Sequence, residues 1–146
     1  MRIEKLTEKH GQFLVVDSDG GVMLRRRNEI NVEGDLPIVV INIKGALGTF
    51  RRLVGSRTRL HKFGVQTCGG ATWKQIRRWK EAGLIAPIEV EVGVNDWYSI
   101  ETGFTAALLG GLRRAGQPMA VLKAVADMCR EPATVEASTE PETVKV

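Results

Sequence analysis

Short runs of apolar residues near the N-terminus predict β structure. Phe13 to Val16 is a run of β-forming residues, Asp17 to Gly21 supplies residues that tolerate a positive φ, and Val22 to Arg25 resumes the run. This order predicts a β-hairpin. A third strand is expected at Ile38 to Ile43, directly after a proline that suits the end of a loop.

The spacing of apolar residues becomes helical after Gly45. Four apolar residues recur at helical intervals: Leu47, Phe50, Leu53 and Val54. They predict a short helix that leads out of the sheet. A further helix is expected around Leu60 to Cys68.

The next segment predicts a helix followed by a second hairpin. Thr72 is a suitable N-cap for a helix of about eleven residues, and Gly83 is placed for a left-handed C-cap. Trp73, Ile76 and Trp79 share one face of this helix. From Ile88 to Tyr98 apolar and polar residues alternate around a Gly and an Asn-Asp pair, which predicts a hairpin.

Two more helices are expected before Arg130. Ser99 caps the first, which ends at Gly116, and Pro118 begins the second. The positions expected to be buried are Ile100, Phe104, Leu108 and Leu112 in the first helix and Met119, Leu122, Ala126 and Cys129 in the second. Gly110 and Gly111 are unfavourable inside a helix, so a close neighbouring helix is expected there.

These elements predict an α+β fold with three parts. Residues 1–59 form a small N-terminal β-rich unit with a short helix, residues 60–130 form a helical domain with a hairpin, and residues 131–146 form a tail. The tail contains two prolines, four glutamates and no aromatic residue, so it is expected to be disordered and acidic.

Charge is distributed unevenly along the 146 residues, although the net charge is only +4. Ten bases and no acidic residue fall between positions 44 and 80: Lys44, Arg51, Arg52, Arg57, Arg59, Lys62, Lys74, Arg77, Arg78 and Lys80. Such a segment attracts polyanions, which favours nucleic-acid binding. The alternative is a solvated charged face.

Several protein classes are not indicated. The apolar runs are shorter than the roughly 18 residues that a membrane span requires, so a cytoplasmic protein with no membrane partner is expected. Cys68 and Cys129 are far apart and predict neither a zinc site nor a disulfide, but two reduced thiols. His10 and His61 are isolated, and no phosphate-binding glycine loop follows a strand. We therefore expect no enzyme, no catalytic residue, no cofactor and no metal.

Two stretches resemble one family. Ala71 to Pro87, ATWKQIRRWKEAGLIAP, resembles the recognition helix and following turn of MerR-type transcriptional regulators. Tyr98 to Met128 resembles the two helices that follow the wing of that family. Together the stretches cover about half of the chain. The resemblance implies that residues 60–130 form a winged helix-turn-helix that binds double-stranded DNA.

The resemblance also implies roles for individual residues. Lys74 and Gln75 would contact bases in the major groove, and Arg77 and Trp79 would contact phosphate. Trp73 either packs in the core or stacks on the sugar-phosphate edge, and a core position is also open for Trp79. The expected DNA-binding residues are Thr72, Trp73, Lys74, Gln75, Arg77, Arg78, Trp79 and Lys80.

The second hairpin departs from the family. It carries Glu89 and Glu91, and the segment Asp96 to Tyr98 stands where the family has Arg-x-Tyr. Phosphate repels acidic groups, so the hairpin either turns away from DNA or meets another partner. The family's sensor domain is also missing from this sequence.

The expected function is therefore a bacterial or phage transcriptional regulator without a sensor domain, possessing a homodimer contact in residues 1–59. Two alternatives remain. One is an excisionase-like or architectural factor that bends DNA. The other is a protein-interaction module that does not bind DNA.

Overall fold

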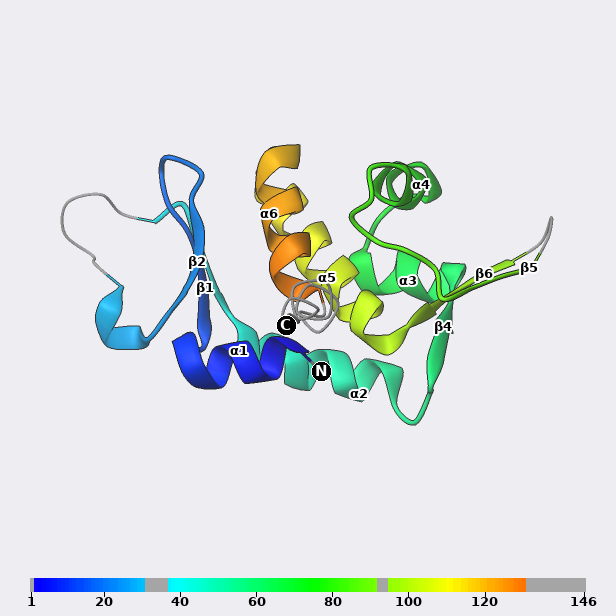
Figure 1. Ribbon diagram of the computed structural model, residues 1–146, viewed down its shortest axis with the longest axis horizontal. Coiled ribbons are helices and arrows are strands. Elements are labelled where there is room, and N and C mark those ends of the chain that lie inside the picture. The colour runs from blue at the N-terminus through cyan, green and yellow to red at the C-terminus, as the bar shows by residue number, and fades with distance from the viewer. Residues whose placement is uncertain (1, 31–36, 92–94, 131–146) are drawn as a thin grey trace, which may run out of the picture.

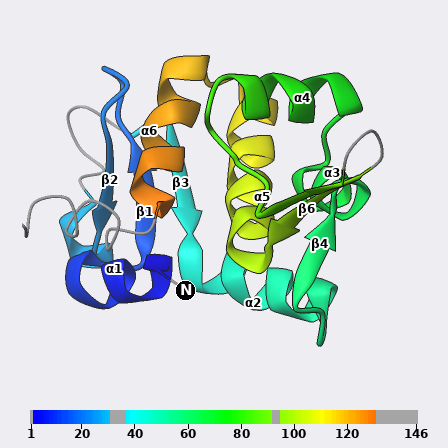
Figure 2. The ribbon, with the colours of Figure 1, turned by 45° about the vertical axis from the view of Figure 1, so that its right-hand side comes forward.

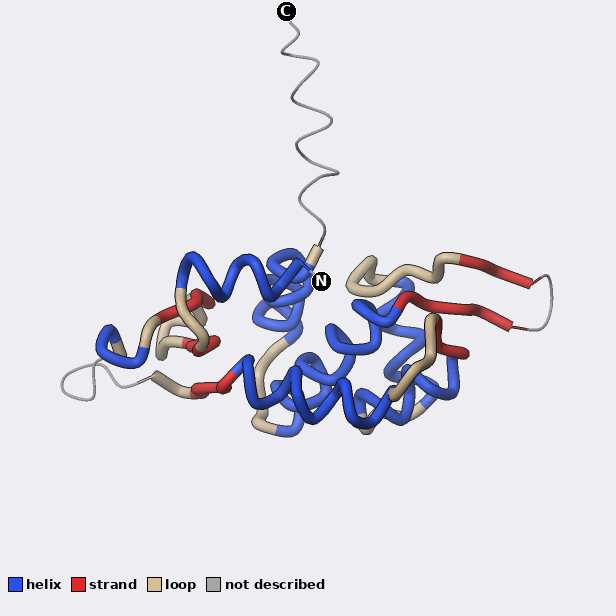
Figure 3. The backbone as a smooth tube through the Cα atoms, turned by 90° about the horizontal axis from the view of Figure 1, so that it is seen from below, coloured by secondary structure: helices blue, strands red, loops and turns tan. Residues whose placement is uncertain are grey.

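The computed structural model describes residues 2–30, 37–91 and 95–130, and within them the protein is a mixed α+β structure. Figure 1 shows the two small sheets at the two ends of the long axis, with helices between them, and Figure 3 shows the same arrangement from below. The N-terminal elements are α1 (Arg2–His10), β1 (Phe13–Val16), β2 (Val22–Arg25), the short 3-10 helix η1 (Arg27–Glu29), β3 (Val39–Asn42) and α2 (Ile43–Val54). The remaining elements are β4 (Arg59–His61), α3 (Lys62–Gly69), α4 (Trp73–Glu81), β5 (Glu89–Glu91), β6 (Asn95–Ser99), α5 (Ile100–Arg114) and α6 (Met119–Cys129). The predicted tail, residues 131–146, lies outside the described residues.

The first sheet has the strand order β2-β1-β3 and is antiparallel throughout. The predicted hairpin is confirmed: Gly20 takes a positive φ of 87°, and the Asp17 amide donates to the Gly21 carbonyl at 2.9 Å. The third strand, predicted at Ile38 to Ile43, forms at Val39–Asn42. Helix α1, which was not among the expected elements, places Ile3 in the core at 2% exposure.

Helix α2 begins earlier than the sequence predicted. The Asn42 side chain caps it by accepting a hydrogen bond from the Gly45 amide at 3.1 Å, so the helix starts at Ile43 rather than after Gly45. Its buried face is made of Ile43, Leu47, Phe50 and Val54. Leu53, which was expected on that face, is 53% exposed.

The second sheet corrects the helix predicted around Leu60 to Cys68. Residues Arg59–His61 form strand β4, which pairs antiparallel with β6 in the order β4-β6-β5, and the helix starts only at Lys62. The predicted domain boundary between residues 59 and 60 therefore falls inside a strand. The predicted second hairpin is confirmed as β5 and β6.

Helices α3 and α5 touch at two glycines. A Cβ built on Gly110 would lie 1.8 Å from the carbonyl oxygen of Gly69, so only glycine fits at position 110. The expected close approach of a neighbouring helix is therefore confirmed for Gly110. It is wrong for Gly111, because a Cβ there would meet no atom within 4 Å.

Both halves of the described chain contribute to one hydrophobic core. The same buried cluster contains Leu14 of β1, Phe50 of α2, Phe104 of α5 and Val125 of α6. Figure 2 shows α6 lying between the first sheet and α5, and α6 contacts α1, β2 and α5. The prediction that Met119 is buried is wrong, since this side chain is 38% exposed at the first position of α6. The core holds α5 in place. Helix α5 in turn supports the segment from α3 to α4, which carries the candidate site.

Candidate nucleic-acid interface

A capping box fixes the start of α4. The Thr72 hydroxyl accepts from the Gln75 amide at 3.2 Å, and the Gln75 side-chain oxygen accepts from the Thr72 amide at 2.9 Å. This arrangement satisfies two amide groups at the helix start and sets its direction. At the other end Gly83 has a φ of +79°, as predicted, and the Leu84 amide donates to the Trp79 carbonyl at 2.8 Å.

Helix α4 has a buried face and an exposed face. Ile76 and Trp79 point into the core, with exposures of 0% and 1%. Trp79 was predicted to contact phosphate; because its ring is enclosed by the core, that prediction is wrong and its role is packing. The exposed stripe runs at helical spacing along the opposite side and consists of Lys74, Arg77, Arg78 and Glu81.

The other predicted site residues differ in their hydrogen bonds, their charged neighbours and their exposure. Thr72 and Gln75 form the capping box, so the carbonyl end of the Gln75 amide is already bonded within the protein. The Arg77 guanidinium lies 3.3 Å from the Glu81 carboxylate, with both side chains about two-thirds exposed at 67% and 66%. Trp73 is 38% exposed, and the Lys62 ammonium lies 4.9 Å from its ring centroid.

Lys80 contacts the hairpin. Its ammonium lies 2.7 Å from the carboxylate of Asp96 on β6, and the Asp96 side chain is only 13% exposed. The residue that departs from the family pattern therefore joins the hairpin to α4. The side chains of Glu89 and Glu91, on which the expected acidity of the hairpin depends, lie outside the described part of the molecule.

Tyr98 is fully buried beside this ion pair. Its hydroxyl has no hydrogen-bond partner within the described structure. Burial, together with the nearby Asp96 carboxylate, raises the pKa of Tyr98 to about 12. The phenol therefore stays neutral. The Tyr98 ring packs in the hydrophobic core and so holds β6 against it.

A second group of side chains lies at this end of the molecule, and of its members only Trp73 was among the expected DNA-binding residues. Aromatic rings and cationic groups follow one another from the second sheet to the start of α4. We name this set the aromatic ladder, and its members are Arg59, His61, Lys62, Phe63, Trp73 and Trp97. The pairing of β4 with β6 assembles it, because His61 lies opposite Trp97 across the two strands. The sequence alone does not show this pairing, since 36 positions separate the two residues.

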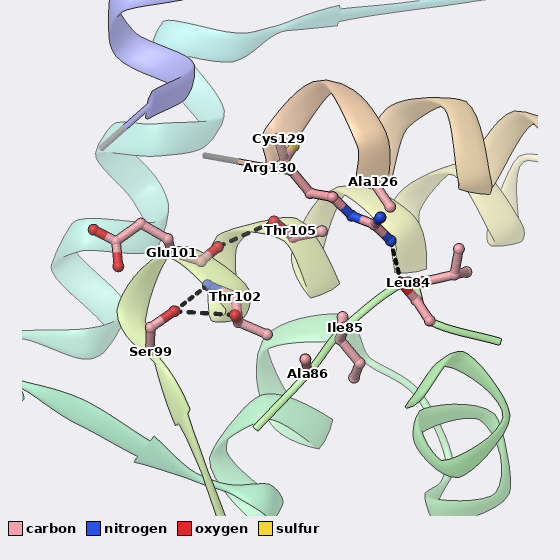
Figure 4. A pocket seen from close by; sticks show the side chains of 11 residues that line it. Leu84, Ile85, Ala86, Ser99, Glu101, Thr102, Thr105, Ala126, Cys129 and Arg130 are labelled. Carbon is pink, nitrogen blue, oxygen red and sulfur yellow. Dashed lines mark hydrogen bonds between the residues drawn. The ribbon is translucent and has the colours of Figure 1, made fainter. Parts of the chain in front are cut away.

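A cleft of about 490 Å³ lies between the loop after α4, the start of α5 and the end of α6 (Figure 4). Its polar groups bind one another. The Ser99 hydroxyl accepts from the Thr102 amide at 3.1 Å, the Thr105 hydroxyl donates to the Glu101 carbonyl at 3.1 Å, and the Arg130 guanidinium donates to the Gly83 carbonyl. The bond from Arg130 to Gly83 therefore joins the end of α6 to the loop after α4 across this cleft.

Cys68 and Cys129 are free thiols and each is partly buried. Burial raises the pKa of both, that of Cys129 to about 11, so neither is an activated nucleophile. Within the described ranges no three His, Cys, Asp or Glu side chains are grouped so that they could hold a metal ion.

No family model, curated protein or solved structure matches this chain. Among the helices described, none has both the length and the apolar composition needed to cross a bilayer.

Proposed function

We propose that the chain binds double-stranded DNA through a MerR-like winged helix in residues 60–130, as a transcriptional regulator. The observation that carries this proposal is the exposed stripe of α4. Three bases, Lys74, Arg77 and Arg78, project from a helix whose opposite face is locked in the core by Ile76 and Trp79. A basic helix held in this way can enter a major groove without losing its own support.

The order of the elements supports the same proposal. Two short helices, α3 and α4, are followed by the β5-β6 hairpin, and this hairpin lies against α4 through the Lys80–Asp96 pair. In a winged helix the second helix contacts the groove while the hairpin lies beside it. The ion pair fixes the hairpin relative to the helix before any DNA is bound.

The positions of the candidate residues support different roles for them. Lys74 is exposed near the start of α4, so it is the side chain best placed to donate to guanine O6 and N7. Arg78 is exposed one turn later, where it can contact phosphate. Arg77 has Glu81 beside it and contributes less net charge. While the capping box is intact, the side-chain oxygen of Gln75 is bonded to the Thr72 amide. Gln75 then offers DNA only its side-chain amide nitrogen as a donor.

The experiment is a fluorescence-anisotropy titration of the full chain against mixed-sequence duplex DNA at several salt concentrations. We expect the logarithm of the binding constant to fall linearly with the logarithm of the salt concentration. Arg78→Ala should weaken binding and reduce the slope by about one, because it removes a phosphate contact, and Lys74→Ala should weaken binding through the loss of a base contact.

Lys123→Ala is the matched control. Lys123 is an exposed lysine with 60% of its side chain accessible, and it lies on α6, away from α4. Its removal changes the net charge by the same amount and should leave the affinity within about twofold. If Lys123→Ala weakens binding as much as Lys74→Ala, the interaction is a general charge effect and α4 is not the contact. If the wild-type chain does not bind duplex DNA at low salt, the proposal is wrong.

A further inference from the structure

Two aromatic side chains of the ladder are exposed, although most aromatic residues of this chain are not. Phe63 is 61% exposed and Trp73 is 38% exposed, whereas Phe50, Phe104 and Trp79 are at most 3% exposed. Phe63 lies in the first turn of α3 and Trp73 is the first residue of α4. These two rings are therefore accessible to a partner.

The rings of the ladder alternate with cationic or imidazole groups at contact distance. The Arg59 guanidinium lies 4.0 Å from the centroid of Trp97. The His61 ring lies 5.1 Å from Trp97 and 4.9 Å from Phe63. Lys62 continues the series, 5.5 Å from the Phe63 centroid. The ladder therefore places planar rings and positively charged groups side by side.

The aromatic ladder is continuous with the exposed stripe of α4. Trp73 belongs to the ladder, and Lys74 follows it in the stripe. Figures 1 and 2 show β4, β6 and α4 at the same end of the molecule. A nucleic acid held by the bases of α4 therefore passes beside the ladder.

We propose that the aromatic ladder binds unpaired nucleotides by stacking, so that the preferred ligand is a DNA duplex with a few unpaired bases next to the segment held by α4. Bases present flat π-surfaces and their phosphates are anionic, which matches alternating rings and cations. An apolar peptide would match the rings but not the neighbouring bases Lys74 and Arg78. This inference rests on the proposed function for the duplex part of the ligand.

The test compares three probes by anisotropy with the full chain. They are a duplex of about 20 base pairs, the same duplex with about four unpaired thymines at its centre, and the corresponding single strand. We expect the duplex with unpaired bases to bind roughly tenfold more tightly than the fully paired duplex, as one or two stacked bases would produce. Tryptophan fluorescence should fall on binding, because bases stacked near Trp73 quench it.

Phe63→Leu separates stacking from apolar contact. Leucine keeps the exposed apolar volume and removes the ring, and a side chain that is 61% exposed can be changed without unfolding the core. Phe63→Leu should reduce the preference for unpaired bases several-fold and leave duplex affinity within about twofold. Leu53→Ala, at an α2 position that is 53% exposed, is the control and should change neither value.

Every other result of these titrations also decides for or against the two proposals. Equal affinity of the wild-type chain for the paired and unpaired duplexes overturns the inference and leaves the proposed function standing. A preference that is unchanged in Phe63→Leu also overturns it. Binding of the single strand without any duplex binding would support the ladder and overturn the proposed role of α4, and failure of all three probes overturns both.

Discussion

The ammonium group of Lys80 lies 2.7 Å from the carboxylate of Asp96, and this pair connects α4 to strand β6. The Lys80 side chain is 39% exposed and that of Asp96 is 13% exposed, so the carboxylate has lost most of its contact with water. A charge in that position depends on its partner. The hairpin and the candidate recognition helix should therefore behave as one structural unit.

A double-mutant cycle with Lys80→Met and Asp96→Asn measures this connection. After allowance for screening at the exposed lysine, we expect a coupling of about 1 kcal/mol in the free energy of urea unfolding. The exposed pair Lys123 and Asp127, 3.7 Å apart, is the control and should give about 0.3 kcal/mol. Equal coupling in both pairs would show that the Asp96 contact is an ordinary surface pair.

Adjacent glycines in α5 should respond in opposite directions to alanine. Gly110→Ala places a methyl group against the Gly69 carbonyl oxygen and should lower the free energy of unfolding by about 3 kcal/mol. Gly111→Ala meets open space and should raise it by up to about 1 kcal/mol through helix propensity. Thermal and urea unfolding of the two variants check this. A similar loss in both would contradict the observed contact.

Thr72 was expected to contact DNA. In the structure its side chain also caps the start of α4. Thr72→Ala removes the hydroxyl that accepts from the Gln75 amide and should cost about 1 kcal/mol of stability. Thr72→Ser keeps the hydroxyl and should stay within about 0.3 kcal/mol of wild type. The comparison is made by urea unfolding without DNA. Loss of stability in the serine variant as well would show that the methyl group, not the cap, matters.

The chain contains one tyrosine, so its titration can be followed without overlap. With the pKa of Tyr98 raised to about 12, tyrosinate absorbance should not develop near pH 10 in the folded protein. Because the unfolded phenol ionises near pH 10, the contribution of this group to stability is complete below that pH and is lost as the pH rises toward about 12. Absorbance and circular dichroism should therefore change together. Tyrosinate that forms near pH 10 before unfolding would contradict the burial.

Elements set by local residues were predictable from the sequence. The hairpin turn at Gly20, the caps at Thr72 and Ser99 and the positive φ of Gly83 each depend on a side chain or glycine within a few positions. Such contacts are visible in the sequence because the residues that make them are neighbours in it.

Elements that depend on distant partners were missed. Helix α1 is anchored by Ile3 in the core and by an ion pair between Glu4 and Arg51 of α2, a contact across 47 positions. Strand β4 exists because it pairs with β6. Helix α1 carries Ile3 and Leu6 at helical spacing, whereas the three residues of β4 have no pattern that could be recognised alone.

The candidate site was predictable only in part. Helical spacing placed Lys74, Arg77 and Arg78 on one helix, but it could not decide which of the two tryptophans faces inward. The structure buries Trp79 and leaves Trp73 partly exposed. The aromatic ladder required the pairing of β4 with β6, which no local pattern indicates.

The contact of Gly69 with Gly110 fixes the distance between two helices by the radii of backbone atoms alone. The Gly69 carbonyl also accepts from the Arg114 guanidinium at 2.9 Å, so the same oxygen is held from two directions. Substitutions elsewhere in the core can then alter the stability of the protein while the separation of α3 and α5 stays constant. Three residues separate the end of α3 from the basic helix α4, so the same backbone contact also fixes the point from which α4 starts.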